Sequence, residues 1–476
     1  MKKKIFRWAL FLISSIVPTL LLASESGQHA PHVNGAGLSV FWVIPFFGIL
    51  LSIAVLPLIA PRFWHHHFGK VSLFWAFALI GPFFLIQGYQ ISLFEILHVG
   101  LLDYVPFIIL LFALFTVSGG IRLTGALVGS PLVNVTIILI GTILASWMGT
   151  TGAAMLLIRP LLRANAWRKQ KVHVVVFFIF LVANIGGSLT PLGDPPLFLG
   201  FLKGVSFFWT TSAMFLPMLV ASVILLIIFY GIDTYYYKKE TNQPPISDSS
   251  EKLGVEGSIN FLWLGVIVGA VLLSGFWNPH IVYHVFYVEV LLQNLARDIL
   301  LLLVAFVSVK TTSMEVRENN EFTWFPIQEV AKLFAGIFVT IIPAIAILKA
   351  GSEGAMAPII NTLYNSSGEP LNIWFFWRTG ILSSFLDNAP TYLVFFNAAG
   401  GDAEVLMTSM SQTLLAISAG AVFMGANTYI GNAPNFMVKS IAEESGLEMP
   451  SFFGYIFKYS LPILIPVFII ISLIFF

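Results

Sequence analysis

Two segments decide the fold: Gly186-Gly187-Ser188-Leu189-Thr190-Pro191-Leu192-Gly193-Asp194-Pro195-Pro196 and Gly425-Ala426-Asn427-Thr428-Tyr429-Ile430-Gly431-Asn432-Ala433-Pro434-Asn435. Each one interrupts a long apolar stretch with small residues, polar residues and prolines. Proline removes an amide donor and glycine frees the backbone, so each segment leaves carbonyl groups without helical partners. Inside a bilayer such groups are tolerated only within protein or around a water-filled cavity. The two segments therefore predict broken helices in the interior of a membrane protein.

The composition around these segments is that of a helical membrane protein. The chain has 476 residues, of which 58% are hydrophobic and 10% are charged, and it contains no Cys. A soluble domain carries about 25% charged residues, so this chain lacks the polar side chains that a water-facing surface needs. Its apolar stretches are about 20 residues long, enough to cross a bilayer as helices. The absence of Cys excludes disulfides and thiolate sites, and the net charge of +1 argues against a nucleic-acid partner.

Residues 1–26 have the features of a bacterial signal peptide. Lys2, Lys3, Lys4 and Arg7 precede the apolar run 8–22, and small residues follow it. The alternative is an uncleaved signal-anchor-like helix, and the residues leave both open. Either segment places the residues that follow it outside the cytoplasm.

We expect an all-α polytopic protein with ten crossings and two re-entrant hairpins. The crossings are 37–60, 72–90, 102–119, 173–202 and 208–235 in the first half, and 257–275, 296–312, 331–350, 411–440 and 452–476 in the second. The interrupted stretches 127–164 and 372–400 are expected to enter and leave the membrane on the same side. A polar cytoplasmic linker, 238–256, joins the first transmembrane repeat, 37–237, to the second, 257–476.

The distribution of Lys and Arg supports this layout, because cytoplasmic loops carry an excess of both. Beyond the N-terminal segment, every Lys and Arg falls on the cytoplasmic side except Lys203, Arg297, Lys349 and Arg378. Reading either hairpin as a single crossing would reverse the loops that follow it and remove this asymmetry.

The two halves resemble each other at a constant offset of 238 residues. At this offset the run 143–148 aligns with 381–386. The identities in the broken segments are Gly187, Thr190, Gly193, Pro196 and Phe198 with Gly425, Thr428, Gly431, Pro434 and Phe436. Each half has an odd number of crossings, so the second is inverted relative to the first, which is the architecture of secondary transporters.

Two carboxylates lie within the breaks, Asp387 at the tip of the second hairpin and Asp194 in the first broken helix. An ionisable group at membrane depth is costly and is a functional candidate. A buried carboxylate can hold either a proton or a metal ion, which is the basis of exchange. The alternative for both residues is helix capping.

Oxygen ligands suited to Na⁺ surround these carboxylates in the sequence. They are Ser384, Thr391, Thr150, Thr151, Ser188, Thr190, Asn388, Asn427, Thr428 and Asn432. Freed backbone carbonyls are expected at the residues that break the helices. Those residues are Gly187, Gly193, Pro195, Pro196, Pro390, Gly425, Gly431 and Pro434. The alternative for the hydroxyl groups is a bond back to their own helix.

Other ionisable residues are interpreted as peripheral. Asp103 and Asp298 are expected at the membrane interface, and Glu329 at the surface before a crossing. The run 65–67, three histidines, is expected in a short cytoplasmic loop in contact with lipid headgroups rather than a metal.

At its breaks the chain resembles the ion transporter superfamily that includes NhaD-type sodium/proton antiporters, arsenite pumps, and citrate and dicarboxylate carriers. The resemblance covers roughly 37–476 and is most specific at 384–390, Ser-Phe-Leu-Asp-Asn-Ala-Pro, and at 186–194. It implies ion and proton binding at Asp387 and Asp194, and a homodimer. The pair Asn427-Thr428 is similar to the Asn-Thr pairs of dicarboxylate carriers, which leaves the substrate open.

The leading hypothesis is a transporter of the inner membrane, with no enzymatic activity, that exports Na⁺ or Li⁺ in exchange for H⁺. Asp387 would be the exchangeable site for Na⁺ or H⁺, with Asp194, Thr190, Asn388 and Asn427 nearby, and membrane lipid would be the other partner. The first alternative is a Na⁺- or H⁺-coupled citrate or dicarboxylate carrier, which a basic residue in the core would favour; Arg378 is the nearest candidate. The second is an arsenite-type exporter. A membrane enzyme or scaffold fits poorly, because neither needs four symmetric breaks.

Overall fold

The computed structural model describes residues 30–125, 127–242 and 254–476. The expected signal segment, 1–26, lies outside the described residues. Within them, eight helices are long and apolar enough to cross a membrane. The chain is therefore a multi-pass membrane protein, largely helical as the sequence predicts.

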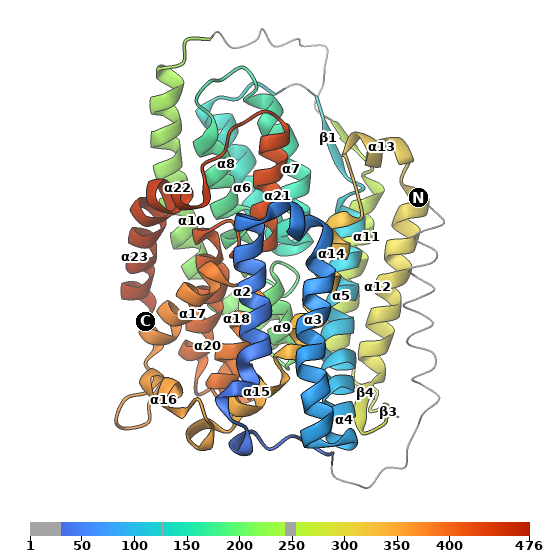
Figure 1. Cartoon of the computed structure of the whole chain (residues 1–476). Helices are drawn as coiled ribbons and strands as arrows, with labels where there is room; N and C mark the ends of the chain where they lie inside the picture. Colours follow the sequence, from blue (N-terminus) through green and yellow to red (C-terminus); the bar gives the residue numbers. More distant parts are fainter. Residues whose placement is uncertain (1–29, 126, 243–253) are drawn as a thin grey trace.

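The first half forms long helices and two interrupted helical stretches, 131–164 and 172–202 (Figure 1). The helices are α2 (Ile44–Ile59), α3 (Pro61–Gln87), α4 (Tyr89–Val99), α5 (Val105–Ser118), α6 (Pro131–Met148), α7 (Thr150–Ala164), α8 (Val172–Leu181), α9 (Pro195–Leu202) and α10 (Phe207–Lys238). A π-helical turn, Gly100–Tyr104, makes α4 and α5 one continuous span. The expected hairpin is formed by α6 and α7, which meet at Gly149. The φ angle of Gly149 is +80°, which residues other than glycine rarely adopt.

The second half repeats this pattern. Its helices are α11 (Ile259–Phe276), α12 (Leu292–Thr311), α13 (Met314–Asn319), α14 (Phe325–Thr340), α15 (Ile342–Lys349), α16 (Ala357–Ile360), α17 (Asn372–Phe385), α18 (Asn388–Ala398), α19 (Ala403–Met407), α20 (Ser411–Met424), α21 (Ala433–Glu444), α22 (Phe452–Tyr455) and α23 (Ile465–Phe475). The second hairpin is α17 and α18, and the second broken helix is α20 and α21. The expected crossing 331–350 is bent by 42° between α14 and α15.

Two details correct the all-α prediction. Strand β1 (Arg122–Thr124) pairs antiparallel with β2 (Gly254–Glu256), so part of the predicted linker is a strand bound to the first half. A second antiparallel pair joins β3 (Val282–Val285) and β4 (Val288–Leu291) ahead of α12. We call the end of the molecule that carries β1 and β2 the linker face, and the end that carries β3 and β4 the opposite face (Figure 1).

Helix α3 corrects a boundary. The prediction of a crossing at 72–90 leaves the three histidines in a loop, whereas α3 begins at Pro61 and contains them. His65 and His66 are exposed on this helix. Within the described residues no group of three or more His, Cys, Asp or Glu is arranged to hold a metal ion.

The broken helices occupy the middle of the bundle. Residues 174–181 of α8 are each at most 1% exposed, since this helix is apolar on every side and surrounded by protein. In Figure 1, α8 lies above α9, whereas α20 lies below α21, so the two broken helices run in opposite directions. Large apolar side chains on α3, α10 and α23 face outward instead.

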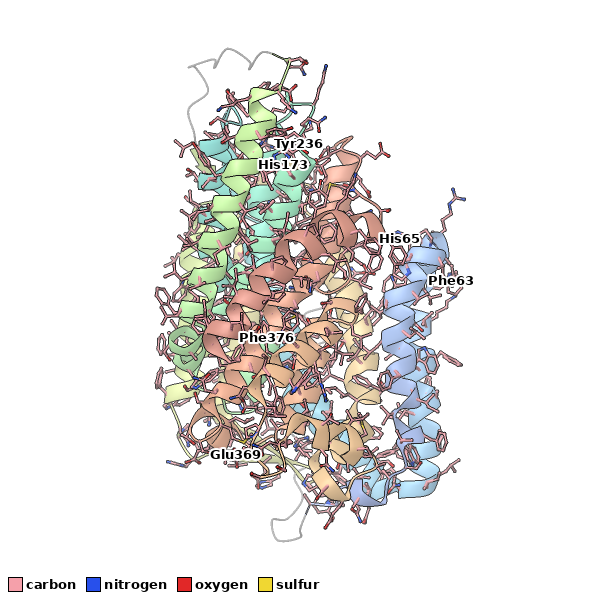
Figure 2. The ribbon with its side chains drawn as sticks, turned by 90° about the vertical axis from the view of Figure 1, so that its left-hand side faces the viewer. Phe63, His65, His173, Tyr236, Glu369 and Phe376 are labelled. Carbon is pink, nitrogen blue, oxygen red and sulfur yellow. The ribbon has the colours of Figure 1, made fainter. Side chains whose placement is uncertain are left out.

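A buried ionic cluster fastens α6, α8 and α10 near the linker face. Asp233 is fully buried and accepts hydrogen bonds from Arg168 at 2.5 Å, His173 at 2.8 Å and Asn134 at 2.9 Å. Figure 2 shows His173 beside Tyr236, with Glu369 at the other end of the molecule. Because breaking a buried ion pair is costly, the contact of Arg168 with Asp233 holds the ends of these helices in one arrangement.

Candidate functional site

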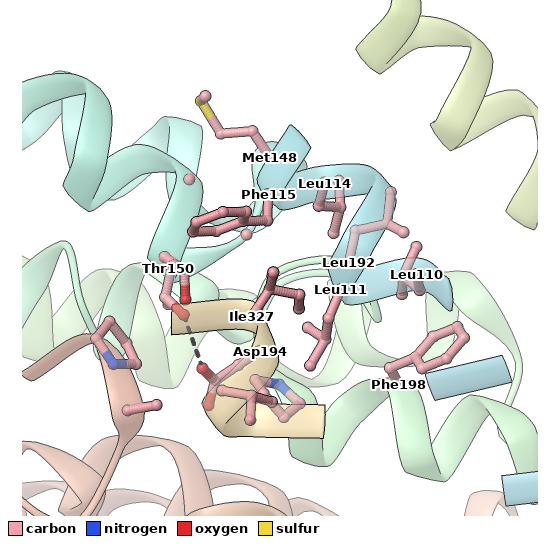
Figure 3. Close-up of a pocket in the computed structure, with 18 of the residues that line it drawn as sticks. Leu110, Leu111, Leu114, Phe115, Met148, Thr150, Leu192, Asp194, Phe198 and Ile327 are labelled. Carbon is pink, nitrogen blue, oxygen red and sulfur yellow. Dashed lines mark hydrogen bonds between the residues drawn. The ribbon is translucent and has the colours of Figure 1, made fainter. Parts of the chain in front are cut away.

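Asp194 lies where all four chain breaks meet. Asp194 is the N-cap residue of α9 and is 1% exposed. One carboxylate oxygen accepts from Thr150 Oγ1 at 3.1 Å, a contact drawn in Figure 3, and from Asn432 Nδ2 at 3.0 Å. The other accepts from Asn388 Nδ2 at 2.5 Å. The donors belong to the first hairpin, the second broken helix and the second hairpin, so one carboxylate binds both halves of the chain.

The local sequence explains why Asp194 stands at this point. Pro195 occupies the first position of α9, where the missing amide costs nothing and φ already suits a helix. Gly193 passes so close to the preceding turn that an added Cβ would lie 2.1 Å from the carbonyl oxygen of Gly187. The glycines and prolines that the sequence marks as helix breakers therefore let the backbone fold tightly against itself beside the carboxylate.

The contacts of the two halves repeat at the offset of 238 residues. Thr190 Oγ1 donates to the carbonyl of Ser146, and Thr428 Oγ1 donates to the carbonyl of Ser384. Gly431 approaches the Gly425 carbonyl as Gly193 approaches that of Gly187, with an added Cβ 2.5 Å away.

The same offset relates the residues at the centre to one another. Asp194 corresponds to Asn432, and Thr150 corresponds to Asn388. Asp194 thus contacts its own counterpart, and it accepts one hydrogen bond from each member of the other pair.

The surroundings of Asp194 are neutral. Among the ion pairs of the described residues, none includes Asp194, and its three donors are an alcohol and two amides. Two amide oxygens of the predicted set, Oδ1 of Asn388 and Oδ1 of Asn427, are buried without a hydrogen-bond partner among the described residues. A buried carboxylate without a cation and two buried unpaired oxygens form an environment that favours a positive charge.

Asp387, the other predicted carboxylate, has a different setting. It caps α18, where its side chain accepts from the amide of Ala389 at 3.1 Å and its carbonyl accepts from Thr391 Oγ1 at 3.0 Å. It lies close enough to Asp194 for the two charges to interact. The capping interpretation therefore describes its hydrogen bonds, and proximity to Asp194 keeps it a candidate for ion binding.

The remaining predicted residues are distributed around this centre. Ser384 donates to the carbonyl of Met424 at 3.0 Å and accepts from Asn427 Nδ2 at 2.9 Å, joining the second hairpin to the second broken helix. Ser188 bonds back to the carbonyl of Ile185 at 2.8 Å, in line with the local alternative. Thr151 lines the pocket beside Asp194.

Two asparagines outside the predicted set complete the network. Asn184 accepts from Asn432 at 3.3 Å and donates to Asn435 Oδ1 at 2.7 Å. Asn435 in turn donates to the carbonyls of Gly425 and Thr428. Asn184 lies two residues before the first broken segment, and Asn435 is the last residue of the second. A polar residue next to a break in an apolar stretch is the sequence signal that could have identified both as site residues.

A pocket connects Asp194 with the linker-face ends of neighbouring helices. Thr150 and Asp194 lie on one side of it and Phe198 on another (Figure 3). Its wall toward the linker face includes Phe115 of α5, Ile327 of α14 and Met437 of α21. Apart from the carboxylate and the tip hydroxyls, the lining is largely apolar, so a bound charge would be shielded from water by hydrocarbon.

The charged residues expected at the periphery are more buried than predicted. Asp103 is 3% exposed and pairs with Lys203 at 2.6 Å, and Asp298 is 7% exposed and pairs with Arg297 at 2.8 Å. Glu329 is half-buried on α14. Each pairing explains how the carboxylate is tolerated inside the protein.

The fold and this centre agree with the comparison against known families. A family model described as "Putative citrate transport" matches residues 35–476. The chain belongs to this family. None of the curated proteins matches the chain. Family and helices together make it a multi-pass membrane transport protein.

Proposed function

We propose that this chain is a secondary transporter that carries citrate together with a monovalent cation, Na⁺ or H⁺, bound at Asp194. The observation that carries the proposal is the buried carboxylate of Asp194, held by three neutral donors at the meeting point of four chain breaks. Citrate comes from the description of the family, which matches nearly the whole chain.

The cation follows from electrostatics. A buried charge without an opposite charge costs several kcal/mol, so Asp194 needs a proton or a metal ion to be stable in the apolar interior. Asn388 Oδ1 and Asn427 Oδ1 are hard oxygen atoms without partners, of the kind that Na⁺ prefers. Asp387, which acts electrostatically on Asp194, supplies a second carboxylate for a proton or a second cation.

The coupling follows from the charge of the substrate. Citrate is an anion, and the carboxylate of Asp194 repels it until a cation neutralises the site. Cation binding therefore precedes or accompanies citrate binding, and the gradient of the cation drives transport.

A second candidate is exchange of Na⁺ or Li⁺ for H⁺ without a carboxylate substrate. The observation that favours it is the absence of Lys, Arg and His from the ion pairs and hydrogen bonds of Asp194 among the described residues. In this case Asp194 and Asp387 alternate between proton and metal ion.

Both candidates use the same architecture. We propose two inverted repeats, with the hairpin α6–α7 entering from the cytoplasm and α17–α18 from the outside, in a homodimer of the bacterial inner membrane. The repeated contacts at the offset of 238 and the opposite directions of the two broken helices support this arrangement. Alternating access at the centre would then expose Asp194 to one side at a time.

The test uses purified protein in liposomes with a trapped pH dye and radiolabelled citrate. Citrate uptake driven by a Na⁺ or a pH gradient, and lost in Asp194→Asn, would establish the first function. Alkalinisation of acid-loaded liposomes by Na⁺ or Li⁺ without any citrate uptake would establish the second. A protein that responds to neither citrate nor these cations would contradict both.

A further inference from the structure

A second buried charge lies beyond Asp194, in the second turn of α12. Arg297 is 2% exposed, although the expected layout places it at the outer end of the crossing 296–312. Its Nε donates to the neighbouring Asp298 at 2.8 Å and its Nη1 donates to Asn294 at 3.3 Å. Its Nη2 is buried and has no hydrogen-bond partner among the described residues.

The position of Arg297 relates it to the candidate site. Its guanidinium lies over the ring of Phe198, 5.9 Å from the centroid, and Phe198 lines the pocket that contains Asp194. Phe198 is on α9, four residues after Asp194 and one helical turn away. One aromatic ring therefore separates the guanidinium from the pocket.

Asp194 and Arg297 lie one after the other on the way from the linker face to the opposite face. The pocket extends from the linker-face ends of the helices to Asp194 and Phe198, and Arg297 follows near the start of α12, at the opposite face. A site that opens to the opposite face, as alternating access requires, would bring this guanidinium next to the substrate.

We infer that Arg297 binds a carboxylate group of the substrate, on the side of Asp194 that faces away from the linker. A guanidinium offers paired N–H groups that match a carboxylate in a bidentate contact, and a buried one with an unpaired nitrogen is costly unless a ligand completes it. Asp298 uses Nε and Asn294 uses one N–H of Nη1, so the second N–H of Nη1 and both of Nη2 are left for the ligand. This rests on the proposed citrate transport and supplies the basic residue that an anion needs.

Arg378, the basic residue that the sequence places nearest to the site, does not fill this role. It donates to Thr362 Oγ1 and lies over the ring of Trp374, 5.3 Å from the centroid. It is half-buried at the entrance of the second hairpin and does not line the pocket of Asp194. Arg378→Gln is therefore the matched control.

The test measures the KM for citrate of full-length protein in liposomes, under a fixed cation gradient. Arg297→Gln should raise KM about tenfold or more, since it removes a charge-assisted, bidentate contact, and Arg297→Lys should lie between it and wild type. Arg378→Gln should leave KM unchanged. Stabilisation of the detergent-solubilised protein by Na⁺ should be the same in wild type and Arg297→Gln, because the cation binds at Asp194.

Removing Arg297 leaves Asp298 buried without its partner and can impair folding, so the neutral pair Arg297→Gln/Asp298→Asn is measured as well. An unchanged KM in the folded single or double variant would overturn the inference and leave the proposed function standing. Equal loss of Na⁺ and citrate binding would assign Arg297 a structural role and overturn it too. Wild-type protein that transports no citrate under any gradient would remove the proposed function first.

Discussion

The substitution Asp194→Asn removes the negative charge of the central carboxylate and keeps its shape. Asparagine keeps the size of the side chain and one oxygen, so Thr150 and Asn432 can still donate to it. The new amide group faces Asn388, whose Oδ1 has no partner and accepts from it after the Asn388 amide turns over. Because the hydrogen bonds are replaced and a buried charge is removed, we expect the free energy of unfolding to change by no more than about 1 kcal/mol.

The effect on cation binding should be much larger. Two unit charges 4 Å apart attract by about 4 kcal/mol at the effective dielectric constant typical of proteins. If desolvation of the ion offsets half of this, about 2 kcal/mol remains, which corresponds to about 30-fold weaker binding. Transport that depends on the cation should fall by at least the same factor at cation concentrations below saturation.

The assay is thermal stability of the detergent-solubilised protein as a function of Na⁺ concentration, followed by uptake into liposomes. Asp402→Asn is the matched control, because Asp402 also caps a helix but is exposed on the surface. Asp387→Asn is measured beside it to divide the role between the two buried carboxylates. Half-maximal stabilisation at the same Na⁺ concentration in Asp194→Asn and wild type would refute the assignment of the cation to this residue.

Three further outcomes follow from the geometry of the centre. The exchange Asp194→Asn/Asn432→Asp moves the carboxylate to the matching position of the other half, and Na⁺-dependent stabilisation should recover relative to Asp194→Asn alone; no recovery would mean that the two positions are not equivalent. Gly193→Ala places a Cβ 2.1 Å from a backbone carbonyl and should cost about 3 kcal/mol or more in stability, whereas Gly231→Ala, with open space around it, should be neutral or stabilising. Asp233→Asn leaves the buried guanidinium of Arg168 without its carboxylate and should lower the free energy of unfolding by about 3–5 kcal/mol. The midpoint of thermal denaturation should fall, with unchanged Na⁺ dependence in the folded fraction. An unchanged midpoint would contradict the stabilising role of this ion pair.

The general layout could be predicted because it depends on local and additive properties. Long apolar stretches predicted helices, but among the described residues eight helices are long and apolar enough to cross a membrane, against the ten crossings expected, and α6, expected as a hairpin arm, is one of the eight. Gly149 and Asp387 lie between paired helices, at the tips that small and polar residues predicted. Boundaries were less accurate where a helix contains polar residues, as α3 does at its histidines, because hydropathy does not register the end of such a helix. The strand pair β1–β2 depends on residues 130 apart in the chain and had no periodic signal.

The candidate site was predicted in its composition but not in its arrangement. The breaks identified Asp194, Thr150, Asn388 and Asn432 individually, and packing of the two halves brings them together around one carboxylate. The hypothesis gave the leading role to Asp387, because Asp194 precedes two prolines and helix capping accounts for it more readily; in the structure Asp194 has the contacts with both halves. Arg297 was placed at the outer end of the crossing 296–312 because charge counting gives only the side of the membrane and cannot recognise an Arg that α9 and α12 enclose.

The central pair of residues differs between the halves in a way that explains coupling. Asp194 and Asn432 stand at matching positions and lie 3.0 Å apart. Two aspartates there would force one to hold a proton permanently, because two carboxylates at that distance cannot both be ionised. Two asparagines would leave no charge to attract a cation. One of each places a single negative charge at this pair, which one monovalent cation or proton neutralises, while Asp387, next to Asn388, supplies a second carboxylate for a proton or cation. In a largely apolar pocket, moving the bare carboxylate past hydrocarbon is unfavourable and moving the neutralised one is not. Under the proposed mechanism, the site therefore reorients only when a cation or proton is bound.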